Sequence, residues 1–316
     1  MNTKLLRRIA ISLGLIALTL WLADPVAVVT ALRRADPRWI IAALTASTSA
    51  VFCGALRWRQ LSLWLGFTAP VSLFLKAQWR GMAANTVLPG AVIGGDTFRA
   101  LHLQRAGARL GTAASSVALD RLSGLWVLVI ISLGLSTLAI AGNLLPRTAL
   151  PLPWPVLALA ATAALLLPPC LWRLSVGTRH LLPEKLATLF ASLHARPHPW
   201  RQYGIQLLGS GLVQTCFILA FGCGGRAVGL DLPLWLFFIA AGPVFILAAL
   251  PVSVGGWGTR EAAAAVTLGI FGAPRELAVA TSILYGLFAV TQGIFGALTL
   301  LIPNDTPPSI SGENDA

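Results

Sequence analysis

The chain has 316 residues, of which 56% are hydrophobic and only 11% charged, and its mean hydropathy is +0.78. A soluble globular domain carries roughly 25% charged residues, so this chain has too little polar surface to face water on all sides. Its net charge is +12. The basic residues cluster in short loops between apolar segments, which is typical of the positive-inside rule for membrane proteins. We therefore expect no nucleic-acid partner.

The first apolar run begins near Ile9, after the basic residues Lys4, Arg7 and Arg8. A basic start followed by an apolar run is the pattern of a cleaved signal peptide and also that of a first membrane helix. Because many more apolar segments follow, we interpret the run as an uncleaved helix whose N-terminus lies in the cytoplasm.

Five later apolar segments approach or exceed the roughly 18 to 20 residues that cross a bilayer as a helix. They are Trp39–Leu56, Thr112–Ala141, Trp154–Trp172, Ile205–Phe221 and Leu277–Ile302. The basic loop at residues 173–202 is expected in the cytoplasm, and its stretch EKLATLFASLHA has the apolar spacing of a short interfacial helix. The sequence thus predicts an all-α polytopic membrane protein with about six transmembrane helices. One membrane domain covers residues 1–302, and a disordered acidic tail covers residues 303–316.

Two pairs of shorter apolar segments remain, Val71–Leu88 with Thr97–Leu110 and Leu234–Leu250 with Thr259–Phe271. The second arm of each pair is too short or too polar to span, so each pair is predicted to be a re-entrant helical hairpin. Irregular backbone at membrane depth requires protein or a water-filled cavity around it. Glycine in the breaks permits positive φ and close backbone approach. The predicted hinge residues are Pro89, Gly94, Gly95, Pro251, Gly255 and Gly256.

Counting crossings from a cytoplasmic N-terminus returns the C-terminus to the cytoplasm and inserts the two hairpins from opposite faces. The stretches LPGAVIGGDTFR and LPVSVGGWGTR then belong to an inverted repeat, in which Asp120 aligns with Tyr285. Inverted repeats with broken helices form the binding sites of many transporters. One group of basic residues departs from the positive-inside rule because the count places it outside. These residues are Arg33, Arg34 and Arg38.

Three motifs occur in order, NTVLPGAVIGGDTFR at Asn85–Arg99, SSVALDRLSGL at Ser115–Leu125 and LPVSVGGWGTREAA at Leu250–Ala263. They resemble the membrane region of bacterial lysylphosphatidylglycerol synthases and the free-standing flippase-like proteins similar to it. The resemblance covers essentially the whole apolar region and implies movement of a lipid head group between leaflets of the bacterial inner (plasma) membrane. The full synthases add a soluble aminoacyl-transferase domain, whereas a short stretch follows Pro303 here, so synthase activity is not expected.

Six charged residues in apolar surroundings are candidates for substrate binding, because a charge at the centre of a spanning helix costs about 2.5–3.5 kcal/mol on insertion scales. They are Asp96, Arg99, Asp120, Arg121, Arg260 and Glu261. Asp96 could instead be a helix N-cap, and Arg99 has the spacing to pair with it.

Adjacent residues of a helix point in different directions. Asp120 and Arg121 therefore each need a partner elsewhere, for which the hairpin charges are the natural choice, and the same reasoning applies to Arg260 and Glu261. The six charges are consistent with a structural network, with a polar groove for a head group, or with both. Three amides on apolar helices are expected to form hydrogen bonds between helices. They are Asn85, Gln214 and Gln292.

In the predicted mechanism Arg99 and Arg260 hold the phosphate of an anionic or aminoacylated phospholipid or of a polyprenyl-linked lipid, because a guanidinium matches phosphate oxygens. The three carboxylates position these arginines or contact an amino or sugar group. No metal, cofactor or enzymatic activity is expected, and a homo-oligomer is left open. Two alternatives are a non-transporting accessory subunit of a lipid- or glycan-modifying enzyme and an intramembrane transferase for a polyprenyl-linked sugar.

Overall fold

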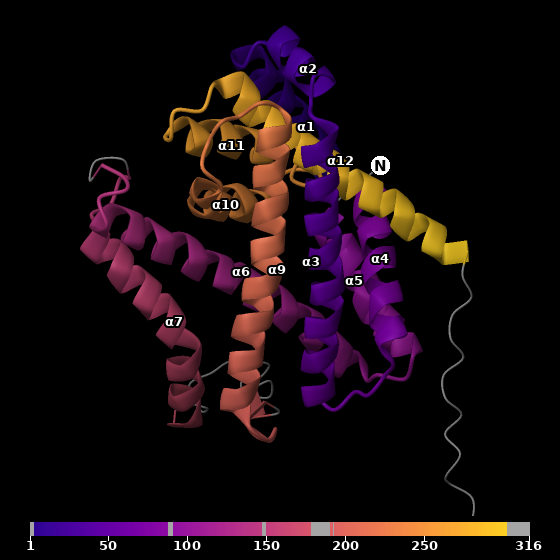
Figure 1. The fold of residues 1–316 in the computed structure, drawn as a ribbon. Helices are drawn as coiled ribbons and strands as arrows, with labels where there is room; N and C mark the ends of the chain where they lie inside the picture. Colours follow the sequence, from indigo (N-terminus) through magenta and orange to yellow (C-terminus); the bar gives the residue numbers. More distant parts are fainter. Residues whose placement is uncertain (1–2, 88–90, 147–149, 178–189, 192, 302–316) are drawn as a thin grey trace, which may run out of the picture.

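The computed structural model describes residues 3–87, 91–146, 150–177, 190–191 and 193–301, which form helices and turns with no strand among them (Figure 1). The helices are α1 (Thr3–Leu22), α2 (Pro25–Arg33), α3 (Pro37–Trp64), α4 (Val71–Val87), α5 (Ala91–Arg105), α6 (Leu110–Ala141), α7 (Trp154–Gly177), α9 (Pro199–Ala227), α10 (Leu234–Ala249), α11 (Thr259–Gly269) and α12 (Arg275–Leu298), followed by the short 3-10 helix η2 (Thr299–Leu301). Five of them, α3, α6, α7, α9 and α12, are long and apolar enough to cross a membrane, and the bent pair α1–α2 is a sixth candidate. The chain is an all-α polytopic membrane protein, as predicted.

The first apolar segment forms two helices rather than the single helix predicted, because an Asp-Pro pair starts a new helix at residue 25. The Asp24 carboxylate accepts hydrogen bonds from the backbone N–H groups of Val26 and Ala27, at 3.0 and 3.3 Å, and α2 leaves α1 at 89°. Asp36 and Pro37 start α3 in the same way. Asp is a favoured N-cap and Pro a favoured first helical residue.

The centre of the bundle is the pair α3 and α9, which run side by side (Figure 1). Next to them α6 contacts α9, α7 and α10. An aromatic cluster fills the space between α9, α10 and α12, where Phe221 packs edge-on against Phe237 and Tyr285. These contacts hold α10 and α12 against α9.

The two predicted hairpins are the helix pairs α4–α5 and α10–α11. The second break is where the sequence predicts it, because residues 250–258 separate the helices and Gly255 and Gly256 have φ of 60° and 77°. Pro251 lies in the same turn. The first break differs from the prediction: Pro89 lies outside the described residues, and α5 already begins at Ala91.

Gly94 and Gly95 therefore lie inside helix α5 and are not hinges. Residue 95 must be a glycine because α4 and α5 approach each other closely there. A Cβ atom at this position would lie 2.6 Å from Cγ of Asn85 on α4. The Asn85 side chain also accepts a hydrogen bond from the Gly95 N–H at 2.9 Å. The glycine thus lets the two helices of the pair meet.

The two helix pairs contact different parts of α12. At its middle, a Cβ on Gly286 would lie 2.8 Å from the Trp257 ring, which belongs to the turn before α11. In its last turns, a Cβ on Gly296 would lie 2.8 Å from the carbonyl carbon of Trp79 on α4 and closer still to its carbonyl oxygen. The turn between α10 and α11 also contacts α1, where the Val254 N–H donates to Ser12 Oγ at 2.7 Å.

Candidate functional site

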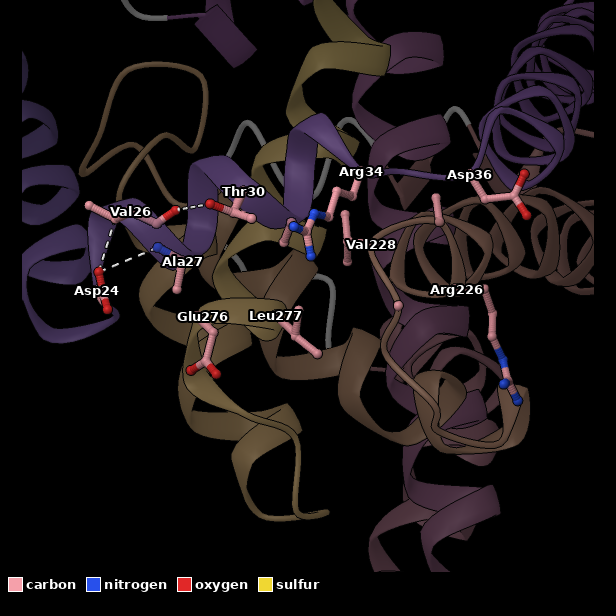
Figure 2. A pocket seen from close by; sticks show the side chains of 13 residues that line it. Asp24, Val26, Ala27, Thr30, Arg34, Asp36, Arg226, Val228, Glu276 and Leu277 are labelled. Carbon is pink, nitrogen blue, oxygen red and sulfur yellow. Dashed lines mark hydrogen bonds between the residues drawn. The ribbon is translucent and has the colours of Figure 1, made fainter.

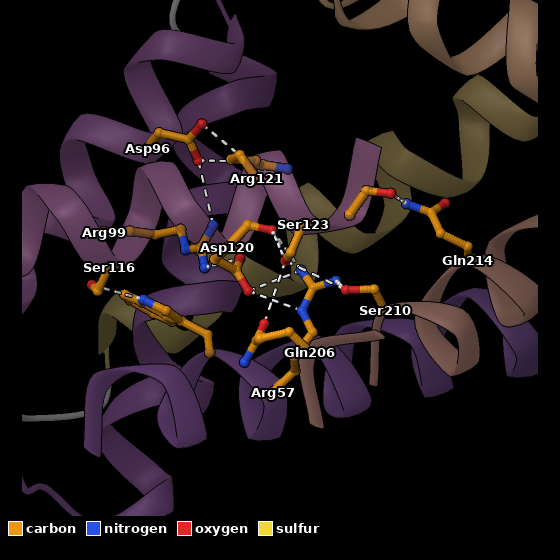
Figure 3. A network of polar contacts seen from close by, with 12 residues as sticks. Arg57, Asp96, Arg99, Ser116, Asp120, Arg121, Ser123, Gln206, Ser210 and Gln214 are labelled. Atoms are coloured by element: carbon orange, nitrogen blue, oxygen red, sulfur yellow. Dashed lines mark hydrogen bonds and ion pairs between the residues drawn. The ribbon is translucent and has the colours of Figure 1, made fainter. Parts of the chain in front are cut away.

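A network of buried ion pairs joins α3, α5 and α6, with Asp120 at its centre (Figure 3). Oδ1 of Asp120 lies 2.8 Å from Nη2 of Arg57, and Oδ2 lies 2.8 Å from Nη2 of Arg99. All three side chains are almost fully buried. The Asp120 carboxylate thus pairs with an arginine of the spanning helix α3 and with an arginine of α5 in the first helix pair.

A second carboxylate extends the network towards the surface. Asp96 on α5 accepts from Nε of Arg121 on α6, at 2.8 and 2.9 Å, and lies 3.4 Å from Nη1 of Arg99. Asp96 is inside α5 and not at its N-cap. The pairs Arg99–Asp120 and Arg121–Asp96 run in opposite senses between α5 and α6, so the predicted pairing of Asp120 and Arg121 with charges of the first helix pair is confirmed.

Arg57 belongs to the network although it is not among the six charges predicted to bind substrate. Helix α3 continues to Trp64, so Arg57 is an interior residue that donates to Ser210 Oγ of α9 at 2.8 Å. Its stem is accommodated by Gly209, where a Cβ would lie 3.2 Å from Arg57 Cγ. Apolar residues continue beyond Arg59, among them Leu61 and Leu63, and this continuation is the signal that could have identified Arg57 as an interior residue.

Arg99 is further fixed by an aromatic side chain of α3. Its guanidinium lies 4.0 Å from the centre of the Trp58 ring, a cation–π arrangement. The indole N–H of Trp58 donates to Ser116 Oγ at 3.1 Å, which sets the orientation of the ring. With an aromatic face and two carboxylates as neighbours, Arg99 is held in a single position.

The network carries an uncompensated positive charge, because three arginines share two aspartates. Its exposure is uneven. The Arg121 side chain is 42% exposed and that of Asp96 20%. Arg121 uses Nε for Asp96, so its terminal nitrogens form the accessible end of the network.

Arg260 and Glu261 form a separate, buried cluster at the start of α11. Contrary to the prediction they pair with each other, because Arg260 Nη2 lies 2.8 Å from Glu261 Oε1. The other oxygen of Glu261 turns back to accept from the Gly258 N–H at 2.6 Å, as in a capping box. Ser282 of α12 donates to Glu261 at 3.0 Å, and the Arg260 guanidinium lies 5.9 Å from the Tyr285 ring. This cluster fastens the second helix pair to α12.

The two arginines predicted to hold one phosphate therefore lie in different clusters. Arg99 contacts Asp96, Asp120 and Trp58, and none of these residues contacts Arg260 in the described part of the chain. Both guanidinium groups are buried and engaged by protein carboxylates. Their geometry fits helix positioning better than direct contact with a ligand.

The three amides predicted to link helices do so. Gln214 of α9 donates to the Gly124 carbonyl of α6 at 2.8 Å, and Gln292 of α12 donates to Ser47 Oγ of α3 at 2.9 Å. The third is Asn85, which joins α4 to α5. Among the described residues no group of three or more His, Cys, Asp and Glu could hold a metal ion.

A pocket of about 690 Å³ lies between α2, the end of α9 and the start of α12 (Figure 2). Arg34, Arg226 and Glu276 are charged residues in its lining. Arg226 follows Ser210 by sixteen positions on α9, which corresponds to about 24 Å along a helix. The pocket is thus remote from the ion network and holds none of the predicted site residues.

The fold and the site define a class, a multi-pass helical membrane protein in which two short helix pairs are fastened to spanning helices by buried charges. The family model described as the lysylphosphatidylglycerol synthase TM region matches residues 6–296. The chain belongs to this family, as the resemblance of its motifs predicted. Comparison with curated proteins yields no match. Family membership connects the protein with membrane lipids.

Proposed function

We propose that this protein moves a lipid with an anionic head group between the leaflets of the bacterial plasma membrane, with both chain termini in the cytoplasm. The observation that carries the proposal is the ion network of Arg57, Asp96, Arg99, Asp120 and Arg121. The network has an excess positive charge, and Arg121 is its partly exposed member, available to a ligand. Charges in a membrane protein are costly and mark binding sites and pathways by default.

The contacts of α12 support insertion of the two helix pairs from opposite faces, as an inverted repeat requires. Along α12 the second pair lies against Ser282 and Gly286, and the first pair lies against Gly293 and Gly296 in the last turns. The turn of the second pair meets Ser12, ten residues before the end of α1 at Leu22, a depth of about 15 Å along the helix. That depth is about half the thickness of the hydrocarbon core.

In this mechanism Arg121 contacts the phosphate of the head group while the acyl chains stay in the bilayer. A guanidinium whose Nε is held by Asp96 retains two terminal nitrogens, enough for a two-point contact with phosphate oxygens. Arg99, Asp120 and Arg57 hold α5, α6 and α3 in place around it. Arg260 and Glu261 have the same positioning role in the second helix pair.

The test is leaflet exchange of a fluorescent anionic phospholipid in vesicles that contain the purified protein. Wild type should accelerate exchange over empty vesicles, and Arg121→Gln should slow it about tenfold or more, since charge-assisted hydrogen bonds contribute about 1.5–3 kcal/mol. The matched control is Arg226→Gln, which removes a partly exposed arginine that pairs with Asp231. If wild type exchanges neither phospholipids nor polyprenyl phosphates faster than empty vesicles, the proposal fails and the accessory-subunit alternative replaces it.

A further inference from the structure

One face of α9 carries a row of polar residues spaced four apart. The row consists of Gln202, Gln206, Ser210 and Gln214. Residues at this spacing lie above one another on a helix, and all four side chains are buried. The row runs about 18 Å along the helix in a segment that is otherwise apolar enough to cross a membrane.

The half of the row nearer the middle of α9 is hydrogen-bonded to the ion network (Figure 3). Ser210 accepts from Arg57 at 2.8 Å, and Ser123 of α6 lies between Ser210 and Gln206 at 3.4 Å from each. Ser123 also donates to the Asp120 carbonyl at 2.9 Å. The row therefore leads to the residues that hold Asp120.

Towards the start of α9, the side-chain amide nitrogens of the row lack a protein partner among the described residues. The side-chain nitrogens of Gln202 and Gln206 are buried and have no hydrogen-bond partner within the described ranges. A buried donor without a partner costs about 1–3 kcal/mol, and native proteins satisfy such donors with ordered water. Both donors lie on the face of α9 that carries Ser210.

We infer that Gln202, Gln206 and Ser210 line a narrow water-filled path from the start of α9 to the Arg57–Asp120 ion pair. The path begins where Trp64, at the end of α3, donates to the Pro197 carbonyl at 2.8 Å. Its lining includes the two amide donors of Gln202 and Gln206, and the path ends at a network with an excess positive charge, so it admits anionic groups in preference to cations. The biological purpose of the path rests on the proposed function. Within that function, the path is the side from which an anionic head group enters water near the network.

The experiment measures the reaction of single cysteines with charged thiol reagents in reconstituted vesicles. The four native cysteines are first replaced by alanine, and one cysteine is then introduced by Gln206→Cys or by Ser210→Cys. The reagents are anionic sulfonatoethyl methanethiosulfonate and its cationic trimethylammonium analogue. Only a hydrated thiol ionises to the thiolate that reacts. The matched control is Leu208→Cys, whose parent side chain is 77% exposed on another face of the same helix.

Both buried positions should react, and the anionic reagent should react about tenfold faster than the cationic one, which corresponds to about 1.4 kcal/mol of electrostatic preference. Leu208→Cys should react with neither reagent, because it faces lipid. Should either variant fail to fold, Gln202→Cys tests the same path. Protection of the introduced cysteines from both reagents, or faster reaction with the cation, would overturn the inference. Labelling is independent of lipid movement, so its failure and the failure of leaflet exchange are distinguishable.

Discussion

Arg57 donates to Asp120 twice, from Nε to the carboxylate at 3.0 Å and from Nη2 to the backbone carbonyl of the same residue at 3.0 Å. The first contact pairs two buried charges, and the second fixes the position of α3 along α6. Since the other carboxylate oxygen receives Arg99, one side chain holds three helices together.

Asp120→Asn should lower the thermal stability of the purified protein strongly. The change leaves Arg57 and Arg99 buried without their shared counter-ion, and breaking a buried pair costs about 3–5 kcal/mol. The measurement is the unfolding midpoint in detergent. Asp231→Asn is the control, because that carboxylate is 90% exposed and exposed pairs contribute about 0–1 kcal/mol. An unchanged midpoint for Asp120→Asn would show that the ion pairs do not stabilise the fold.

Arg57→Gln should destabilise the protein less than Asp120→Asn. In this variant Asp120 keeps its pair with Arg99, and the network becomes electrically neutral. Unfolding midpoints of the two variants and of their combination provide the comparison, since residues in one network are not additive. Equal losses in both single variants would indicate that the Arg57–Asp120 pair accounts for the whole effect and that the Arg99–Asp120 pair adds no stability.

Gly296→Ala should weaken the contact between α4 and α12. The added Cβ would lie 2.8 Å from the carbonyl carbon of Trp79 and closer still to its carbonyl oxygen, and overpacking of this kind typically costs about 1–3 kcal/mol. Gly134→Ala is the matched control, because a Cβ at that helical glycine meets no atom within 4 Å. Its midpoint should be unchanged or higher, since Ala favours helix over Gly. Equal effects of the two changes would contradict close packing at Gly296.

Reporter fusions after Arg201 and after Leu301 should report the cytoplasm, and a fusion at Asn143 should report the opposite face. This outcome follows from the crossing count with two re-entrant helix pairs. An external signal after Leu301 would mean that at least one pair crosses the membrane, and the inverted repeat would be lost. Correct expression of each fusion is checked with an antibody against the reporter.

A cross-link between Ser12→Cys and Val254→Cys should form within one chain, because the Val254 N–H lies 2.7 Å from the Ser12 hydroxyl. The cross-linked chain is identified by its shifted mobility, which a reducing agent reverses. Ser12→Cys with Leu208→Cys is the control pair. Loss of the N-terminal helix from the purified protein, seen by mass spectrometry, would support the signal-peptide alternative instead.

The sequence was sufficient for most helices because apolar length and helix-start residues are local signals. The bounds of α6 and α12 differ little from the predicted segments. Hinge placement was harder, because the Gly94-Gly95-Asp96 stretch resembles a helix start as closely as the second motif does. In that second motif Gly255 and Gly256 do have positive φ. Local sequence did not show that α5 begins three residues before Gly94.

Side-chain partners were predicted in part. That Asp120 and Arg121 need separate partners follows from helix geometry alone, and the first helix pair provides both. The pairing of Arg260 with Glu261 depends on the side chain of Glu261 folding back over the first turn of α11. Arg57 was missed because its charge resembled a loop residue, and its role depends on how α3 packs against α6.

Helix α12 is held at two places along its length, by Trp257 at Gly286 and by Trp79 at Gly296. At both places the α12 residue is a glycine, so each tryptophan packs directly against the backbone of α12. Helix α12 therefore connects the two helix pairs. A displacement of one helix pair is therefore expected to reach the other through α12, although their charged clusters share no residue. An enlarged side chain at Gly296 is expected to alter the packing around Trp257.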